Sequence, residues 1–323
     1  MMTSNTYAKM PHSLPQQEQQ PLVSIITVNY NQPKATEALI TSVFSGNHYT
    51  NVELIVVDNA SATDPVPEWR TRYPMVRFFR SEKNLGFAGG NNLGMQEAEG
   101  DYLFLVNNDT EFTPMLVHTM VSYMERDKTI GIASPKINYF HEANQIQYAG
   151  FTPINYYTGR NECIGQYEQD HGQYWERSGS TGYAHGAAMM ISRDAYEAAG
   201  PMPETYFLYY EEMDWCEAIR RAGYEVHVNT KATIYHKESV SVGKRSALKE
   251  YFMNRNRILF IRRNATKATA AIFYCYFLML VVPRNLLLYL RRKEAHFIAP
   301  FLKALLWHIR HHADSAETGY VIH

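Results

Sequence analysis

Three short apolar runs in the first 110 residues each stop at a cluster of Asn and Asp. The runs cover residues 22–28, 52–57 and 102–106, and they are rich in Val, Ile, Leu and Phe. Continuous apolar runs of this length are typical of strands in a parallel sheet covered on both faces. Since ligands bind outside the carboxyl ends of such strands, the clusters predict a single site at one edge. The clusters are Asn29-Tyr30-Asn31, Asp58-Asn59 and Asn107-Asn108-Asp109.

The spacing of the other patterns supports this interpretation. Helical patterns are expected at residues 34–45, 84–99 and 113–126, and further strands at 76–79 and 131–134. This alternation predicts an α/β fold, with a mostly parallel sheet and helices on both faces.

The second half of the chain is less regular. Residues 135–182 are expected to hold a strand or two and a long loop, followed by an apolar run at 185–192. A helix is predicted in the second half of residues 206–222, where Gly223 is a natural C-cap. Two short strands are expected at 225–229 and 232–235, and they end at His236.

The net charge of −1 hides a strong asymmetry. Before Lys244 there are 17 Lys and Arg against 28 Asp and Glu, and from Lys244 onward there are 14 against 4. We therefore expect an acidic main domain (22–243) and a basic, apolar helical tail (244–323), preceded by a polar disordered leader (1–21). The three cysteines are far apart, which gives no disulfide framework and fits a reducing, cytoplasmic setting.

The tail carries an uncharged run at residues 268–283, bounded on both sides by Lys and Arg. A spanning helix needs about 20 apolar residues, and Pro283 followed by Arg284 is expected to break this run. Together with residues 297–309, it predicts interfacial helices on the inner face of an anionic membrane. Packing on the body or on a second subunit, as in a homodimer, is the alternative. The apolar content of the tail argues against nucleic acid as the partner.

Three carboxylates, Glu211, Glu212 and Asp214, stand at the start of the helix expected within 206–222. Acidic residues also stabilise a helix N-terminus, so capping is the plain explanation for them. The neighbouring aromatic residues suit a sugar, and a partly dry carboxylate could act as a general base. Asp109 is a candidate ligand for a hard cation if a diphosphate supplies further oxygens, whereas a lone His236 is by itself weak evidence.

Taken in order, these stretches resemble family 2 glycosyltransferases of the GT-A fold, close to the bacterial rhamnosyltransferase-like members. The tail stretch YFMNRNRILFIRRN also resembles the C-terminal extension of that family. Each stretch is weak alone, and together they are specific. The matching stretches are VSIITVNYNQ, ELIVVDNAS, NLGFAGGNNLGM, YLFLVNNDTEF, GAAMMISRDAYEAAGPMPETYFLYYEEMDWCEAIRRAGYEV and ATIYHKESVSVG.

The resemblance implies a nucleotide-sugar donor and a Mg²⁺ or Mn²⁺ ion held by Asp109 and His236. It implies that Asp58 accepts a hydrogen bond from the ring N–H of uracil or thymine, and that Asn108 lies near the ribose. The other residues implied in donor binding are Val28, Tyr30, Asn84, Gly89, Gly90, Asn91 and Asn107.

The resemblance also implies an inverting reaction in which Glu212 is the base, while Glu211 and Asp214 support it and touch acceptor hydroxyls. Two positions depart from the family pattern. Asn107 replaces the first carboxylate of the D-x-D motif, and Glu212 stands where the family has Asp, which extends the base role to the Glu212 and Asp214 pair.

The implied donor is dTDP-rhamnose or a UDP-sugar, and the implied acceptor is a glycan or lipid-linked hydroxyl in surface polysaccharide synthesis. A nucleotide-dependent oxidoreductase or a sugar nucleotidyltransferase would need a glycine-rich loop after the first strand, and residues 29–33 contain no glycine. A catalytically inactive sugar- or lipid-binding protein of the same fold remains the alternative.

Overall fold

The computed structural model describes residues 20–142, 144–237 and 246–320. Most of the predicted leader, and the expected boundary between residues 243 and 244, lie outside these ranges. The elements of the first half are β1 (Val23–Asn29), α1 (Pro33–Gly46), β2 (Val52–Asp58), α2 (Val66–Arg72), β3 (Val76–Arg80), α3 (Gly86–Glu97), β4 (Tyr102–Val106), β5 (Thr110–Phe112) and α4 (Leu116–Glu125). They are followed by β6 (Ile130–Tyr139), β7 (Ile146–Tyr148), β8 (Gly179–Ser180), β9 (Ala188–Ser192), α5 (Arg193–Ala199), η1 (Glu204–Tyr206), α6 (Glu211–Arg221) and β10 (Glu225–His236).

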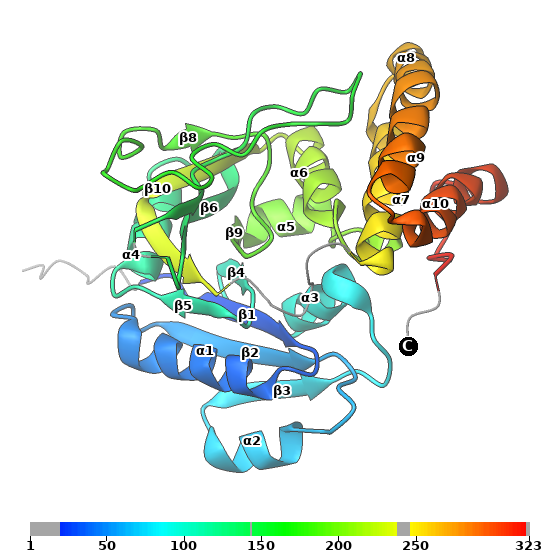
Figure 1. Ribbon diagram of the computed structural model, residues 1–323. Helices are drawn as coiled ribbons and strands as arrows, with labels where there is room; N and C mark the ends of the chain where they lie inside the picture. The colour runs from blue at the N-terminus through cyan, green and yellow to red at the C-terminus, as the bar shows by residue number, and fades with distance from the viewer. Residues whose placement is uncertain (1–19, 143, 238–245, 321–323) are drawn as a thin grey trace, which may run out of the picture.

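One sheet runs through the body of the molecule (Figure 1), in the order β3-β2-β1-β4-β9-β6-β10-β5. Strands β3, β2, β1 and β4 are parallel, and so are β6 and β10. Strand β9 runs antiparallel to both of its neighbours, β4 and β6, and joins these two blocks. The predicted α/β fold is confirmed, with its parallel pairing in two blocks.

Helices cover both faces of the sheet because successive residues of a buried strand point to opposite sides. Ile25 packs on the face that carries α1, α2 and α4, whereas Ile26 packs on the face that carries α3, α5 and α6. Both residues are fully buried. The uninterrupted apolar runs in the sequence follow from this double coverage.

Most expected elements are present within a few residues of their predicted ends. The two short strands expected at 225–229 and 232–235 are one strand, β10, with an irregularity between Asn229 and Thr233. Helices α2 and α5 were not predicted, and each has only seven residues. The 135–182 segment contributes the end of β6, β7, β8 and a hairpin at residues 151–163, with isolated bridges between Phe151 and Cys163 and between Asn155 and Arg160.

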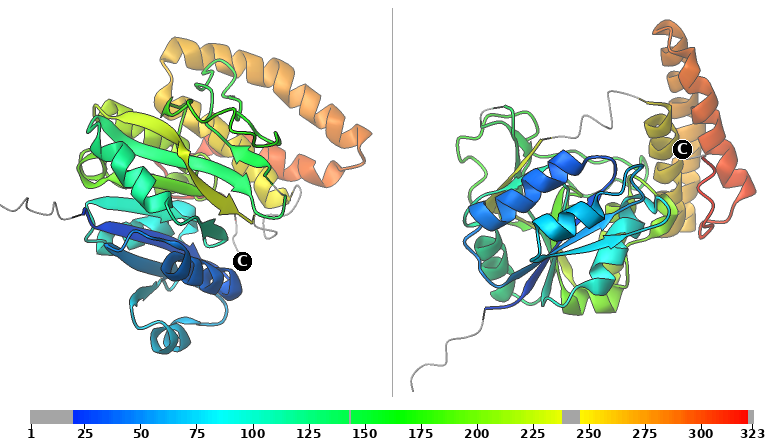
Figure 2. Two further views of the ribbon diagram at one scale, coloured as in Figure 1. Left: turned by 90° about the vertical axis from the view of Figure 1, so that its left-hand side faces the viewer. Right: turned by 90° about the horizontal axis from the view of Figure 1, so that it is seen from below.

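The C-terminal helices form a separate layer beside α6 (Figure 2). Asn256 donates to the carbonyls of Tyr206, Leu208 and Tyr209, which fixes α7 to the segment just before α6. The helices of this layer are α7 (Ala247–Asn264), α8 (Lys267–Tyr276), η2 (Phe277–Val281), α9 (Val282–Arg291), η3 (Ala295–Phe297) and α10 (Ile298–Arg310).

The expectation that Pro283 breaks the first tail helix is wrong. The helix continues from Lys267 to Arg291, and it is long and apolar enough to cross a membrane by length and composition alone. The turn before the proline, Phe277–Val281, is π-helical. A wider turn leaves room for the proline ring and needs no N–H at that position, so the helix passes through.

Candidate functional site

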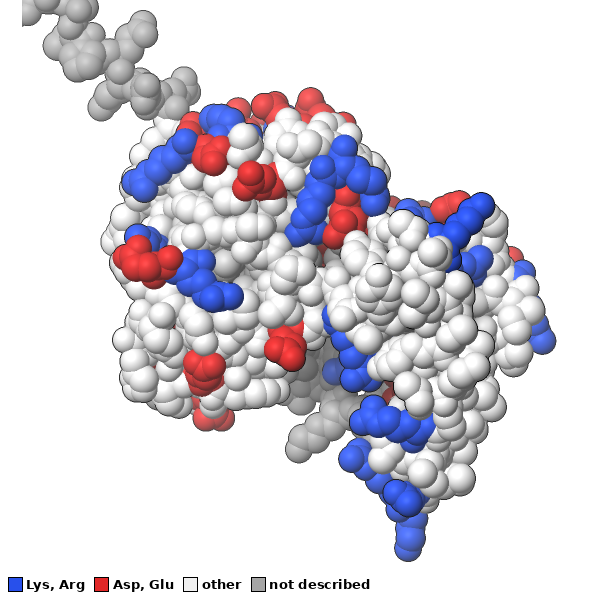
Figure 3. Space-filling model, turned by 90° about the horizontal axis from the view of Figure 1, so that it is seen from above, with Lys and Arg blue, Asp and Glu red and all other residues white. Residues whose placement is uncertain are grey.

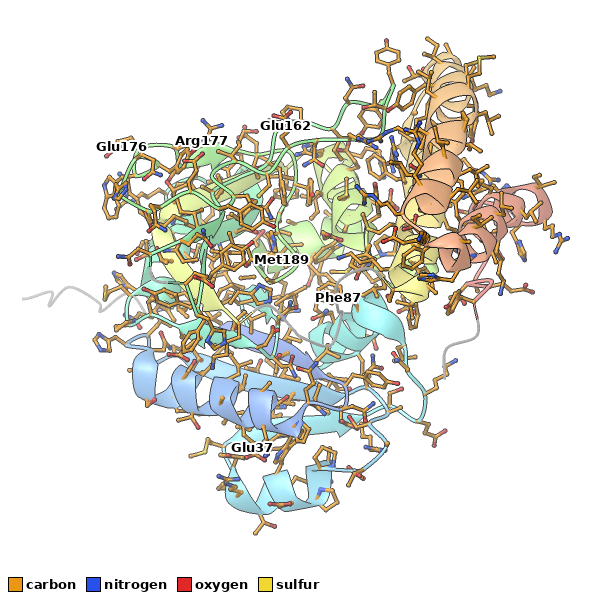
Figure 4. The ribbon with its side chains drawn as sticks, in the orientation of Figure 1. Glu37, Phe87, Glu162, Glu176, Arg177 and Met189 are labelled. Carbon is orange, nitrogen blue, oxygen red and sulfur yellow. The ribbon has the colours of Figure 1, made fainter. Side chains whose placement is uncertain are left out.

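A cavity of about 430 Å³ opens at the carboxyl ends of β1 and β4, where the sequence predicted a site. Its walls come from the ends of both strands, the start of α3 and the segment before α6. Figure 4 labels Phe87, which begins the α3 wall on the side where α6 lies. The lining residues are Val28, Tyr30, Asn31, Gln32, Asn59, Asn84, Gly86, Phe87, Asn91, Val106, Asn107, Asn108, Asp109, Phe207, Leu208 and Leu248.

Behind one end of the cavity lies a buried hydrogen-bond network. Asn29 donates to Asp58 Oδ1 at 2.7 Å and to Ser61 Oγ at 3.0 Å. The side-chain oxygen of Asn29, Oδ1, accepts from the hydroxyl of Thr36 at 2.9 Å, and the side chain of Asn108 donates to that hydroxyl at 3.0 Å. The network connects the ends of β1, β2 and β4 in one fixed arrangement.

Asp58 belongs to this network and does not line the cavity. It is fully buried, and its second oxygen accepts from Arg80 and from the Ser61 amide. The next residue, Asn59, does line the cavity and donates to Asn84 at 3.1 Å. The sequence analysis assigned Asp58 to donor binding through the family resemblance and gave Asn59 no separate role.

The glycines of α3 divide into two groups. Gly86 lines the cavity with a φ of +72°, and a Cβ there would come within 2.3 Å of the Phe207 carbonyl oxygen. Gly90 lies one layer deeper, where a Cβ would stand 2.8 Å from the Val28 side chain. Gly89 likewise packs within the protein, so the structure gives both predicted glycines a packing role.

Close to the Asn108 side of this network, strand pairing brings Asp109 and His236 together. β5 returns antiparallel to β10, and Thr110 is paired with His236 in that register. Asp109 Oδ1 lies 3.1 Å from His236 Nε2, and both side chains are largely buried. Two predicted ligands that are 127 positions apart in sequence are therefore neighbours.

Asp109 and His236 could hold a divalent cation if a diphosphate supplied its remaining ligands. Asp109 Oδ2 is buried, and it has no hydrogen-bond partner within the described part of the chain. Among the described residues, no group of three or more His, Cys, Asp and Glu could hold a metal. His236 Nδ1 lies 2.8 Å from Gln147 Oε1, an arrangement that orients a ligating imidazole. Sequence reasoning missed Gln147, which lies in a segment without any motif.

The candidate base, Glu212, sits at the start of α6 after three residues with positive φ, Phe207, Tyr209 and Tyr210. Such conformations are strained for large side chains and are often found at functional sites. A Cβ on Gly186 would stand 3.8 Å from Glu212 Oε1 and 3.7 Å from the ring of Phe87, so the carboxylate lies close to the cavity wall. Burial raises the pKa of Glu212 to about 7.

The two other acidic candidates behave differently. Glu211 is buried, and among the described residues its Oε2 has no hydrogen-bond partner. Burial, reinforced by the charge of Glu212, raises the pKa of Glu211 well above its usual range, which favours the protonated form. Asp214 faces α7, where it accepts from Arg263 at 2.8 Å and from Asn264. The structure does not bring Asp214 to the cavity.

The aromatic residues around α6 also divide. Phe207 lines the cavity, whereas Tyr206 and Trp215 are fully buried in the core, and Trp215 donates to the Gly200 carbonyl. A larger cavity, of about 670 Å³, lies between residues 153–157 and the junction of α7 and α8. It contains none of the predicted site residues.

Comparison with known proteins supplies the context for this geometry. The model of the family described as "Glycosyl transferase family 2" matches residues 24–199.

The low-salt glycan biosynthesis hexosyltransferase Agl10 of Haloferax volcanii is 25% identical over 310 residues, covering 91% of this chain and 93% of that protein. The N-acetylglucosaminyl-diphospho-decaprenol L-rhamnosyltransferase of Mycobacterium tuberculosis is 24% identical over 238 residues, covering 67% and 76%. An uncharacterized Sinorhizobium fredii protein, y4gI, is 26% identical over 253 residues, and the chain spans only 27% of its length.

Solved structures share the fold at low sequence identity. The mannosyltransferase PcManGT from Pyrobaculum calidifontis, in complex with GDP-Man and Mn²⁺, has a TM-score of 0.55 at 16% identity, covering 93% of this chain and 90% of that one. TarS of S. aureus (residues 1–349), in complex with UDP-GlcNAc, has a TM-score of 0.56 at 16% identity, covering 88% and 81%.

Proposed function

Since the chain belongs to glycosyl transferase family 2 and is a glycosyltransferase, we propose that it moves a sugar, with inversion, from a nucleotide-diphosphate donor to an acceptor hydroxyl. The observation that carries the proposal is the placement of Asp109 and His236 at one end of a cavity and of Glu212 beside its Phe87 wall. Negative charge develops on the leaving diphosphate next to Asp109 and His236, and the proton of the acceptor hydroxyl must be removed next to Glu212.

In this mechanism Asp109 and His236 hold a Mg²⁺ or Mn²⁺ ion, which would neutralise the departing diphosphate. Glu212 accepts the proton of the acceptor hydroxyl while that oxygen forms its bond to the anomeric carbon. The bond from the anomeric carbon to the diphosphate oxygen breaks in the same step, so no covalent enzyme intermediate is needed. Glu211 stays neutral, and Asp214 positions α6 against α7.

We assign dTDP-rhamnose or a UDP-sugar as the donor, because one relative is named as an L-rhamnosyltransferase. Tyr30, Asn59 and Asn84 line the cavity, and we assign the nucleotide base to their side of it. Asp58 acts there as a positioning residue, through its bonds to Asn29 and Ser61.

A lipid-linked acceptor is favoured by the name of the same relative, whose substrate carries diphospho-decaprenol, and by the surface of the tail. Phe273, Phe277 and Val281 are buried, whereas Met279 on the other side of the same helix is 72% exposed. On α10, Ile309 is 82% exposed. The exposed apolar face comprises Ile272, Leu278, Met279, Leu280, Leu287, Leu290, Leu302, Leu306 and Ile309.

The charges around this face match an anionic bilayer. Residues 266–310 contain seven Lys and Arg and one acidic residue, Glu294. Figure 3 shows the white surface of the C-terminal helices bordered by blue Lys and Arg side chains. Because one side of the long helix packs on the protein, we propose that it lies on the inner face of the membrane rather than crossing it.

A thermal-shift panel tests donor binding directly. UDP, dTDP, GDP and CDP are each added with Mn²⁺ and with EDTA, because a ligand that binds only the folded state raises the melting temperature. We expect a metal-dependent shift with dTDP or UDP. Equal shifts with EDTA, or none with any nucleotide, would contradict the proposed donor site.

Vesicle sedimentation tests the membrane face. We expect binding to phosphatidylglycerol vesicles that weakens with added salt, and little binding to phosphatidylcholine. Met279→Asp should reduce this binding, whereas Phe44→Asp, which changes an exposed apolar residue on α1, should not. Equal loss in both variants would refute the assigned face.

A further inference from the structure

Two arginines next to the 151–163 hairpin have no acidic partner. Arg257, on α7, is only 7% exposed, whereas Arg160, on the hairpin, is exposed. Within residues 20–142, 144–237 and 246–320, neither forms an ion pair with Asp or Glu. The Arg257 guanidinium bonds to the Thr158 carbonyl and to the Tyr276 side chain, but these neutral groups do not balance its charge, so this position favours an anionic ligand.

The hairpin turn rests on Arg257. The guanidinium donates from Nε to the Thr158 carbonyl at 3.0 Å, and Nη2 donates to the same oxygen. A Cβ on Gly159 would come within 3.1 Å of Arg257 Cγ. The turn is closed by the Asn155 amide, which donates to the Arg160 carbonyl at 2.8 Å. These contacts hold Arg160 in the turn that packs on Arg257.

This pair of arginines lies on the same side as the candidate base. Tyr210, two residues before Glu212, has its ring 6.1 Å from Phe260, one helical turn along α7 from Arg257. Tyr156 of the hairpin lies 5.6 Å from the same Phe260 ring. Burial raises the pKa of Tyr210 to about 12, and the charges of Arg257, Glu212 and Arg160 all act on that phenol.

Arg257 also contacts the helix that carries the exposed apolar face. Its guanidinium lies 5.3 Å from the ring centroid of Phe277 and 5.8 Å from that of Phe273. Both rings are on the buried side of the long helix that presents Met279 outward. Arg257 therefore lies against the protein-facing side of the helix whose other side presents the exposed apolar face.

We propose that Arg160 and Arg257 bind the phosphate or diphosphate of a lipid-linked acceptor, on the acceptor side of Glu212. The inference deepens the proposed function and rests on its lipid-linked acceptor. The planar guanidinium suits a phosphate because it offers paired donors in a fixed geometry. The donor diphosphate is a separate ligand, since the described lining of the donor cavity contains neither arginine.

Binding of farnesyl diphosphate tests this inference without knowledge of the acceptor sugar. The full-length protein is titrated in EDTA, so that the donor metal site does not contribute, and the same titration is repeated with Asp109→Ala. We expect Arg160→Gln to weaken binding about tenfold or more, and Asp109→Ala to leave it unchanged. Arg257→Lys keeps the charge but loses the paired donors, and should weaken binding less.

The matched control is Arg177→Gln, which removes the same charge from the same 135–182 segment. Figure 4 shows Arg177 at the end of this segment away from the C-terminal helices. A melting curve checks that each variant is folded, and the Mn²⁺-dependent nucleotide shift checks donor binding separately. If the wild-type protein gave a normal nucleotide shift but did not bind farnesyl diphosphate, this inference would be overturned and the proposed function would stand.

Two further ligands separate the sources of phosphate. Inorganic diphosphate should bind much more weakly than farnesyl diphosphate, and equal binding would overturn the assignment to a lipid. Phosphatidylglycerol vesicles should bind the wild type and Arg160→Gln alike. A loss of vesicle binding as large as the loss of farnesyl diphosphate binding would mean that the pair contacts head groups, which would overturn the acceptor assignment. Equal binding of farnesyl diphosphate by wild type, Arg160→Gln and Arg177→Gln would also overturn it.

Discussion

The proposed donor end of the site, at β1 and β4, and the proposed acceptor end, around α6, differ in how their polar atoms are hydrogen-bonded. At the donor end, Asn29, Thr36 and Asn108 bond to one another and to Asp58 in a closed network. Around α6, several buried polar atoms have no hydrogen-bond partner among the residues that the structure describes. They are Thr205 Oγ1, Tyr206 Oη, Tyr209 Oη and Glu211 Oε2.

The difference indicates that bonds within the protein already order the proposed donor end, whereas polar atoms at the proposed acceptor end are available to a ligand. At the proposed donor end, Asp109 Oδ2 and Thr27 Oγ1 have no hydrogen-bond partner among the described residues. Changes at the donor end should therefore act through binding, and changes at the base should act through the chemical step.

Glu212→Gln should have the largest effect, because it removes the proposed base without changing the size of the side chain. We expect turnover to fall about a thousandfold, within the range typical of general-base catalysis. The metal-dependent nucleotide shift should stay intact, because the donor end is separate. Turnover near that of the wild type would move the base role to another group.

Asp109→Ala should reduce turnover about a hundredfold by weakening metal-dependent donor binding. The measurement is the nucleotide shift with Mn²⁺, which should fall to its value in EDTA. Glu111→Ala is the matched control, since it removes a carboxylate two positions away that pairs with the Lys237 side chain instead. If the two variants lost the shift equally, the assigned metal position would be incorrect.

The pH profile should show the titration of Glu212. Burial raises its pKa to about 7, and only the ionised form accepts a proton, so turnover should rise between pH 6 and pH 8. For a single group with this pKa the rise is about tenfold. The profile is measured with donor and acceptor saturating, so that it reports the bound complex. A flat profile across this range would contradict a buried carboxylate base.

The sequence predicted the position of the cavity for a physical reason, because the apolar runs of β1, β2 and β4 end in polar clusters at one edge of a parallel sheet. The pairing of β5 with β10, which brings Asp109 and His236 together, was not predicted, and these two residues were assigned through the family resemblance. Val28, Tyr30 and Asn84 also line the cavity as expected.

Contacts between segments far apart in sequence were not predictable in the same way. Asp58 and Asp214 both looked like site residues, and their partners Arg80 and Arg263 turn them into buried structural links. Gln147 and Arg160 come from an irregular segment without any motif, so only the folded chain places them. Pro283 carried a real helix-breaking signal, which the π-helical turn before it overrides.

Thr36→Val tests the closed network at the donor end. Valine keeps the shape but leaves Asn29 Oδ1 and Asn108 Nδ2 without their partner, which should cost about 1–3 kcal/mol of stability. We expect the KM for the donor to rise about fivefold with little change in kcat. The control is Thr41→Val on the same helix, whose exposed hydroxyl bonds only to the Glu37 carbonyl. Equal effects of the two substitutions would mean that the network is not needed for donor binding.

Glu211→Gln should have the smallest effect on activity, because a protonated carboxylic acid and an amide are both neutral. We expect turnover within about twofold of the wild type, with an unchanged pH midpoint. The stability should change in a pH-dependent way. A carboxyl with a raised folded pKa stabilises fully below its unfolded pKa and loses that contribution as pH rises. Melting curves at pH 5 and pH 8 should show that the melting temperature of the variant, relative to that of the wild type, is higher at pH 8 than at pH 5. A large loss of turnover in Glu211→Gln would instead make Glu211 an ionised partner in the reaction, and the acceptor end would then hold two charged carboxylates.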